Sequence, residues 1–169
     1  MDSGKPRAVH TTTTFRLGAL GAAATDRFAT GIARLGLKPK HVAVLTALRT
    51  APPASQLDLA HRLGVAPSAM VALADGLESL GAVERVHDPA DRRRQLLHLT
   101  THGLDLLAQC DAVAVDIDNQ LRLTLGPQSF DQLTASLAKL ATETGPAAHD
   151  RPVRFGDSER GPTVPDSGR

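Results

Sequence analysis

Two short apolar-patterned segments joined by a three-residue turn constrain the fold of this chain more than any other feature of its sequence. The first segment begins at Ser55, a suitable helix N-cap, and ends at Leu63. The second begins at Pro67 and ends at Gly81. Because proline favours the first turn of a helix and glycine ends one, both segments are predicted to be helices. Two short helices separated only by residues 64–66 predict a helix-turn-helix.

A basic hairpin is predicted directly after these helices. Residues 83–87 and 95–99 are short strand candidates, and Asp88, Pro89, Ala90 and Asp91 between them are typical of a turn. Three consecutive arginines follow the tip of this hairpin. A hairpin placed after a helix-turn-helix predicts the winged form of that motif.

Helical spacing continues on both sides of the winged domain. Apolar residues three or four positions apart predict a first helix over residues 17–35 and a second over residues 39–49. The same spacing predicts a long helix over residues 104–121 and a last helix over residues 130–140, separated by Gly126 and Pro127. The fold class is therefore mainly α.

The terminal helices carry more apolar surface than one small winged domain can cover, and this predicts a homodimer. We expect residues 14–36 and 101–143 to form a helical dimerisation region and residues 37–100 to form the winged helix-turn-helix with a two-stranded β-wing. Residues 1–13 and 146–169 are expected to be a disordered arm and a disordered tail, because they offer little to bury.

The combination of these motifs resembles the multiple-antibiotic-resistance-regulator (MarR) family over about residues 15–141. The resemblance lies in the wing sequence, in the turn and recognition helix, and in the start of the second helix: Asp88 to Arg93 with Leu99-Thr100, Leu63 to Ser68, Leu73 to Glu78 with Gly81, and Leu37 to Pro39. The family consists of homodimeric transcription factors, mostly repressors. Small anionic or phenolic compounds often release them from DNA.

The resemblance implies two kinds of contact with double-stranded DNA. The start of the recognition helix is expected in the major groove, and its candidate residues are Ser68, Ala69, Val71 and Ala72. The wing is expected at the minor groove and the phosphates. There Arg93 enters the groove, Asp91 holds its guanidinium, and Arg92 and Arg94 flank the phosphates.

This chain departs from the family pattern in its recognition helix. Ala69, Ala72 and Gly76 stand where family members usually carry polar or basic residues, and Ala66 replaces the usual Ser or Thr cap. Direct base readout is therefore expected to be small. We expect a larger share of the affinity from wing and phosphate contacts, with a steep salt dependence.

Three further residue types raise separate hypotheses. His41 is a candidate for the effector pocket that the resemblance implies, or else a surface residue at a helix start. Cys110 is either an oxidant-sensing thiol or a small buried apolar residue, and the lack of a basic neighbour in sequence favours burial. His98 and His102 are separated by a strand-to-helix junction, so no metal site is expected.

Composition narrows the function classes. The net charge is +1, and the aromatic residues are four phenylalanines, which argues against single-strand binding by base stacking. One cysteine cannot form an internal disulfide and suits a cytoplasmic location. The longest apolar stretch, residues 17–24, is too short to cross a membrane.

No motif of nucleophilic, phosphate-loop or metalloprotease chemistry is found, so neither an enzyme nor a cofactor is expected. The favoured function is a ligand-relieved repressor that binds a pseudo-palindromic operator. The alternative is a winged-helix module for protein association with weak or no DNA binding.

Overall fold

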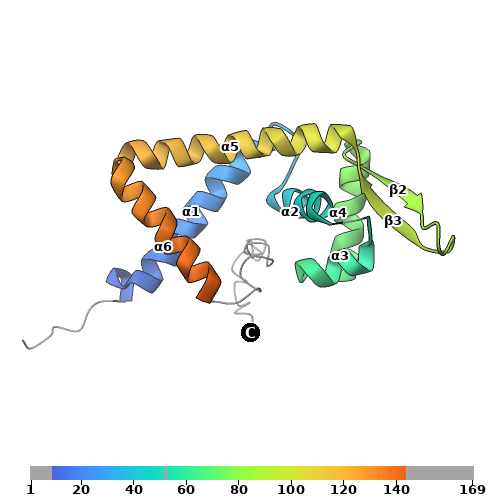
Figure 1. Cartoon of the computed structure of the whole chain (residues 1–169), viewed down its shortest axis with the longest axis horizontal. Coiled ribbons are helices and arrows are strands. Elements are labelled where there is room, and N and C mark those ends of the chain that lie inside the picture. The colour runs from blue at the N-terminus through green and yellow to red at the C-terminus, as the bar shows by residue number, and fades with distance from the viewer. Residues whose placement is uncertain (1–8, 52, 144–169) are drawn as a thin grey trace, which may run out of the picture.

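The computed structural model describes residues 9–51 and 53–143, and its long helix α5 connects two groups of elements (Figure 1). At one end of α5 lie the helices α1 and α6, and at the other lie α3, α4 and a small sheet. The helices are α1 (Thr13–Ala33), α2 (Pro39–Thr50), α3 (Gln56–Leu63), α4 (Pro67–Ser79), α5 (Thr101–Leu125) and α6 (Pro127–Glu143), and a short 3-10 helix, η1 (Val9–Thr11), precedes α1. The strands are β1 (Ala54–Ser55), β2 (Val83–His87) and β3 (Gln95–Leu99).

The expected fold class is confirmed, with one correction to the sheet. β2 and β3 have the predicted bounds and pair antiparallel, with Val83 opposite Leu99. The sheet has three strands rather than two, because β1 pairs with β3 on its other edge through Ala54 opposite Leu97. A strand of two residues is too short to show an alternating apolar pattern, so the sequence indicated only a break before α3.

The core is formed where α2 packs against α4, α5 and β3. Its largest fully buried side chains come from nearly every element of the winged domain and from both long helices: Ile32, Leu45, Leu59, Met70, Leu77, Leu97 and Leu107. Burial of this shared core fixes α4 and the wing on one end of α5. The two candidate DNA-contacting elements therefore belong to one packed unit.

Regular structure begins before residue 14, within the arm that was expected to be disordered. Residues 9–11 form η1, and α1 begins at Thr13 because the Thr12 hydroxyl accepts a hydrogen bond from the Phe15 N–H at 3.3 Å. A side-chain oxygen at this position satisfies an N–H that has no partner within the helix. Residues 1–8 and the expected tail, 146–169, lie outside the described residues.

The buried face of α5 consists of Gly103, Leu106, Leu107, Cys110 and Val113. Leu104, the first residue of the predicted helix, is exposed. The face is set by the sheet, because the Thr100 hydroxyl donates to the Gly81 carbonyl at 2.7 Å and accepts from the Gly103 N–H at 3.0 Å. These bonds start α5 directly against the end of the wing.

A capping box at the start of α3 leads to a first prediction. The Ser55 hydroxyl accepts from the Asp58 N–H and donates to the Asp58 carboxylate at 2.6 Å, and this bond lowers the pKa of Asp58 below its ordinary 3.8. Ser55→Ala is expected to lower the free energy of unfolding by about 1 kcal/mol, measured by urea denaturation. It should also raise the pKa of Asp58 in an NMR titration.

The sign of the pH effect follows from the depressed pKa. The contribution of Asp58 is present above the unfolded-state pKa and is lost as the pH falls through the lower, folded-state pKa. Ser68→Ala is the matched control, because the exposed Ser68 hydroxyl makes no hydrogen bond among the described residues. Equal destabilisation by both variants would contradict the capping role of Ser55.

Candidate nucleic-acid interface

The turn between α3 and α4 sets which face of α4 points outward. Gly64 ends α3 at φ +62°, and its N–H donates to the Ala60 and His61 carbonyls. Met70, Ala74 and Leu77 fill the buried side of α4. The predicted base-contacting residues lie on the opposite side and are all exposed: Ser68, Ala69, Val71 and Ala72. As expected, the N-cap Ala66 makes no side-chain capping bond.

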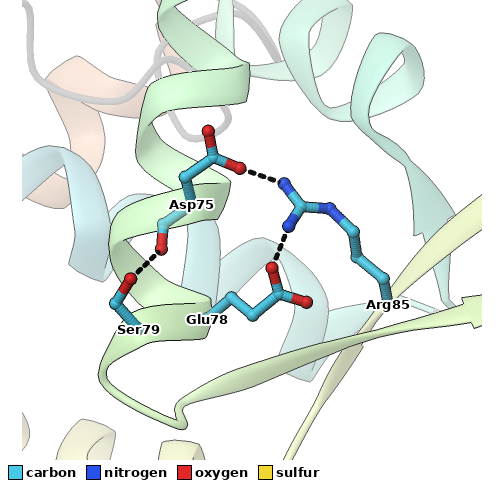
Figure 2. Close-up of polar contacts among 4 residues, drawn as sticks. All are labelled: Asp75, Glu78, Ser79 and Arg85. Atoms are coloured by element: carbon cyan, nitrogen blue, oxygen red, sulfur yellow. Dashed lines mark hydrogen bonds and ion pairs between the residues drawn. The ribbon is translucent and has the colours of Figure 1, made fainter.

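The C-terminal half of α4 is joined to the wing by an arginine that the sequence did not single out. The Arg85 guanidinium on β2 donates to the carboxylates of both Asp75 and Glu78 (Figure 2). The Arg85 side chain is only 19% exposed, so the pair of contacts is partly shielded from water. The Ser79 hydroxyl donates to the Asp75 carbonyl at 2.8 Å. Arg85 therefore holds the recognition helix and the wing in a fixed relation.

The sequence contained a weak signal for this contact. Glu78 and Arg85 are seven residues apart and flank the turn that contains Gly81. Opposite charges on the two sides of a helix-to-strand turn are placed to meet when the strand folds back along the helix. That folding back is a tertiary contact, so the pattern alone did not indicate it.

The wing tip is a turn held by two aspartates. The Asp88 carboxylate accepts from the Ala90 N–H at 2.8 Å, and the Asp91 carboxylate accepts from the Arg93 N–H at 3.0 Å. All three arginines of the tip are exposed. Asp91 thus contacts the backbone of Arg93, and no ion pair joins the two side chains among the described residues. This contact gives Asp91 a role in shaping the turn, and its expected contact with the Arg93 guanidinium stays a prediction.

Arg94 differs from its two neighbours. Its guanidinium lies 3.4 Å from the Asp58 carboxylate on α3. Both side chains are half exposed, so this ion pair is weak and easily exchanged for a phosphate. Arg92 and Arg93 make no side-chain ion pair among the described residues and present free guanidinium groups.

His41 is located away from a ligand pocket. Its Nδ1 accepts a hydrogen bond from the Lys38 N–H at 3.2 Å, and a methyl group added to Gly76 on α4 would lie 3.3 Å from its Nε2. Burial lowers the pKa of His41, and the positive charge of Lys38 lowers it further. His41 therefore packs α2 against α4, and it lines neither of the two clefts described below.

The two clefts lie elsewhere. The larger, about 760 Å³, lies between α1 and α5 and is lined by charged and apolar residues: Asp26, Arg27, Thr30, Gly31, Arg34, Val113, Asp116, Ile117 and Gln120. The smaller, about 140 Å³, lies beside β3 and is lined by Leu48, Pro53, Leu97, His98 and Leu99. Arg27 on α1 and Arg34 at its C-cap give the larger cleft two donors for an anion, beside the carboxylates of Asp26 and Asp116.

Cys110 has the environment of a buried packing residue. Its side chain is buried on α5, and burial raises the pKa of the thiol, as does the charge of Asp111. Within residues 9–51 and 53–143, no group of three or more His, Cys, Asp or Glu side chains is placed to hold a metal ion. Over the same residues, no helix combines the length and apolar character that a membrane crossing requires.

Comparisons with known proteins bear on this geometry. The MarR family model matches residues 35–94, from the turn before α2 to the wing arginines. The chain is also similar to the transcriptional repressor CouR solved with a 23-mer DNA duplex, with a TM-score of 0.67 and 28% identity over 82% of this chain and 98% of that chain. Residues 35–94 therefore match the MarR family model, and the chain shares the fold of a DNA-bound repressor.

Other transcriptional regulators are also similar to the chain. The apo form of MarR from E. coli is 25% identical over 76% of this chain and 96% of that chain, with a TM-score of 0.66. The transcriptional regulator HosA from Escherichia coli O111:H- is 30% identical over 83 residues, which are 49% of this chain. The match spans 61% of HosA and 63% of a second curated relative, from Thauera aromatica, so it covers less than two thirds of either.

Proposed function

We propose that this chain is a MarR-family transcriptional regulator, and that it binds double-stranded DNA as a homodimer and represses transcription. Two observations together support it most: the start of the recognition helix is exposed, and Arg92 and Arg93 of the wing make no ion pair among the described residues. The repressor CouR, which shares this fold at 28% identity, was solved on a DNA duplex. In this proposal the start of α4 enters the major groove, with Ser68, Ala69, Val71 and Ala72 facing the bases. Arg93 enters the minor groove, and Arg92 and Arg94 contact phosphates.

The terminal helices supply the proposed dimer interface. Residues 14–36 and 101–143 expose many large apolar side chains, among them Phe15, Leu17, Leu20, Leu123, Leu133, Leu137 and Leu140. Leu123 is 86% exposed, which is costly for a leucine on a long helix in water. A second copy that covers these side chains with its own terminal helices yields a two-fold particle with two α4 helices.

The dimer is tested by charging its proposed interface. The double variant Leu133→Glu/Leu137→Glu is expected to be a monomer, because it would bury four unpaired carboxylates per dimer. Light scattering coupled to size-exclusion chromatography measures the mass. Leu57→Glu on α3 is the matched control and should remain dimeric, since Leu57 is exposed but lies outside the terminal helices. A monomeric wild-type chain at the same concentration would contradict the proposal.

DNA binding is tested with the duplex upstream of the chain's own gene. Fluorescence anisotropy is expected to show binding whose affinity falls steeply with salt. Two wings that each neutralise at least two phosphates predict a slope of about −4 in log affinity against log salt. A slope near zero would contradict phosphate contacts by the wing arginines, and no binding at low salt would contradict the proposed function.

The larger cleft is the candidate effector site of this regulator. Arg27 and Arg34 suit the small anionic or phenolic class of effector, and Asp26 and Asp116 line the same cleft. The earlier candidate, His41, is bonded to Lys38 and packed on Gly76, so the geometry favours the cleft instead. Thermal-shift measurements on the wild-type chain and on Arg34→Ala, each with benzoate and with phenol, distinguish the two sites. A ligand-induced shift that is lost in Arg34→Ala supports the cleft, and a shift that is kept supports His41.

A protein-association module remains the second candidate function. The exposed apolar start of α4 favours it, because such a surface also suits a protein partner. The anisotropy experiment separates the two functions, since an association module would bind no duplex. The proposed regulator needs no catalytic step and no cofactor, and it acts in the compartment that holds the DNA, which in a bacterial cell is the cytoplasm.

A further inference from the structure

The recognition helix α4 lacks the side chains that usually read bases through hydrogen bonds. Its thirteen residues include no Lys, Arg, Asn or Gln. Arginine and lysine pair with guanine in the major groove, and asparagine and glutamine pair with adenine. Neither of these common contacts is available to α4.

The acidic and hydroxyl groups in the second half of α4 are bonded within the protein. Arg85 binds the carboxylates of Asp75 and Glu78, and the Ser79 hydroxyl donates a hydrogen bond to the Asp75 carbonyl (Figure 2). A free carboxylate would accept from the cytosine amino group and would repel nearby phosphates. Arg85 binds one oxygen of each carboxylate and offsets part of their negative charge, which weakens this readout and reduces the repulsion.

The exposed groups that remain at the start of α4 are mostly methyl groups. Ala69, Val71 and Ala72 are exposed, and Val71 is 46% exposed although it is large and apolar. Ser68 is the single side chain in the first two turns that can form a hydrogen bond to a base. The thymine C5-methyl is the one apolar group that a base pair presents in the major groove, and alanine side chains contact it.

We infer that α4 selects its operator by packing Ala69, Val71 and Ala72 against thymine C5-methyl groups in the major groove. This inference rests on the proposed function and specifies which chemical group the recognition helix reads. Burying a methyl group is expected to stabilise the complex about as much as burying a methylene group does. This corresponds to about a fourfold gain in affinity for each contacted thymine. Two symmetric half-sites would double this free energy, giving about fifteenfold for one thymine in each half-site.

The test begins with duplexes that the wild-type dimer selects from a randomised DNA pool. Each thymine of the selected half-sites is then replaced by uracil, which removes only the C5-methyl. We expect a loss of affinity of about fifteenfold when one contacted thymine is replaced symmetrically in both half-sites. Uracil placed outside the half-sites is the control for effects on DNA shape and should leave the affinity unchanged.

Protein variants assign the effect to α4. Val71→Ala/Ala72→Gly removes three methyl groups from the exposed face and is expected to reduce the uracil penalty several-fold. Ser68→Ala should keep the full penalty, because it removes a hydroxyl and no methyl group. Dimer mass and thermal midpoint of each variant are measured alongside to show that it is folded.

The outcomes separate the inference from the proposed function. If selected duplexes bind equally well with thymine and uracil, methyl readout is wrong and DNA binding stands. A uracil penalty that the double variant leaves intact would also overturn the inference, because the methyl would then act without α4. If no duplex is selected, the proposed function fails as well.

Discussion

Replacement of Gly103 by alanine is expected to lower the free energy of unfolding by about 3 kcal/mol, at the upper end of the usual cost of overpacking. Gly103 is buried at the start of α5, and an added Cβ would lie 2.1 Å from the Ala82 carbonyl oxygen and 2.7 Å from the Leu99 Cδ1. A backbone oxygen cannot rotate away as a flexible side chain can. The helix would have to move off the sheet and break the hydrogen bonds that Thr100 makes to the Gly81 and Ala82 carbonyls.

Thermal unfolding followed by circular dichroism measures the effect, which should lower the midpoint by roughly 10 °C. Gly18→Ala is the matched control, since it adds the same methyl to a glycine of α1 with nothing within 4 Å. Because α1 belongs to the proposed dimer interface, both variants are compared in the monomeric Leu133→Glu/Leu137→Glu background. Gly18→Ala should unfold at the temperature of that background or slightly above it, because alanine favours a helix. An unchanged midpoint for Gly103→Ala would show that α5 and the wing do not approach as closely as described.

Replacement of Arg93 by alanine is expected to weaken DNA binding by about 1–3 kcal/mol, and nearly equally for all duplex sequences. The uniform effect follows because an arginine in the minor groove responds to groove width and negative potential more than to base identity. The loss of charge from both wings should also make the salt dependence shallower. Fluorescence anisotropy on the selected duplex and on an unrelated one measures both quantities.

Arg16→Ala is the control for the loss of one positive charge per chain. Arg16 is exposed on α1, in the part of the chain assigned to the dimerisation region. Its replacement should leave the affinity near that of the wild-type chain. Similar losses for Arg16→Ala and Arg93→Ala would indicate a response to net charge, which would contradict a specific position of the wing on the duplex.

The order of elements could be predicted from the sequence because local signals mark their ends. Pro39, Pro67 and Pro127 each stand at the first residue of a helix, and Gly64 ends α3 in the left-handed region that glycine tolerates. The strand bounds 83–87 and 95–99 agree with the structure because turn residues separate them. These signals involve neighbours in sequence and need no tertiary contact.

The contacts that shape the candidate site could not be predicted in this way. Arg85 meets Asp75 and Glu78 only after β2 folds back along α4, and β1 forms only because β3 offers it an edge. His41 faces the small Gly76 of another helix, so its position depends on packing. Asp91 is close to Arg93 in sequence, but the choice between its guanidinium and its N–H depends on the turn geometry.

A hydroxyl-radical footprint of the wild-type chain on its selected duplex tests the central claim most directly. A two-fold dimer with a wing at each end predicts two protected minor-groove segments that flank half-sites about one helical turn, or about 10 base pairs, apart. Both flanking segments should lose protection together in Arg93→Ala. A single protected segment, or a flank protected equally in wild type and Arg93→Ala, would contradict a dimer that straddles the duplex with its wings.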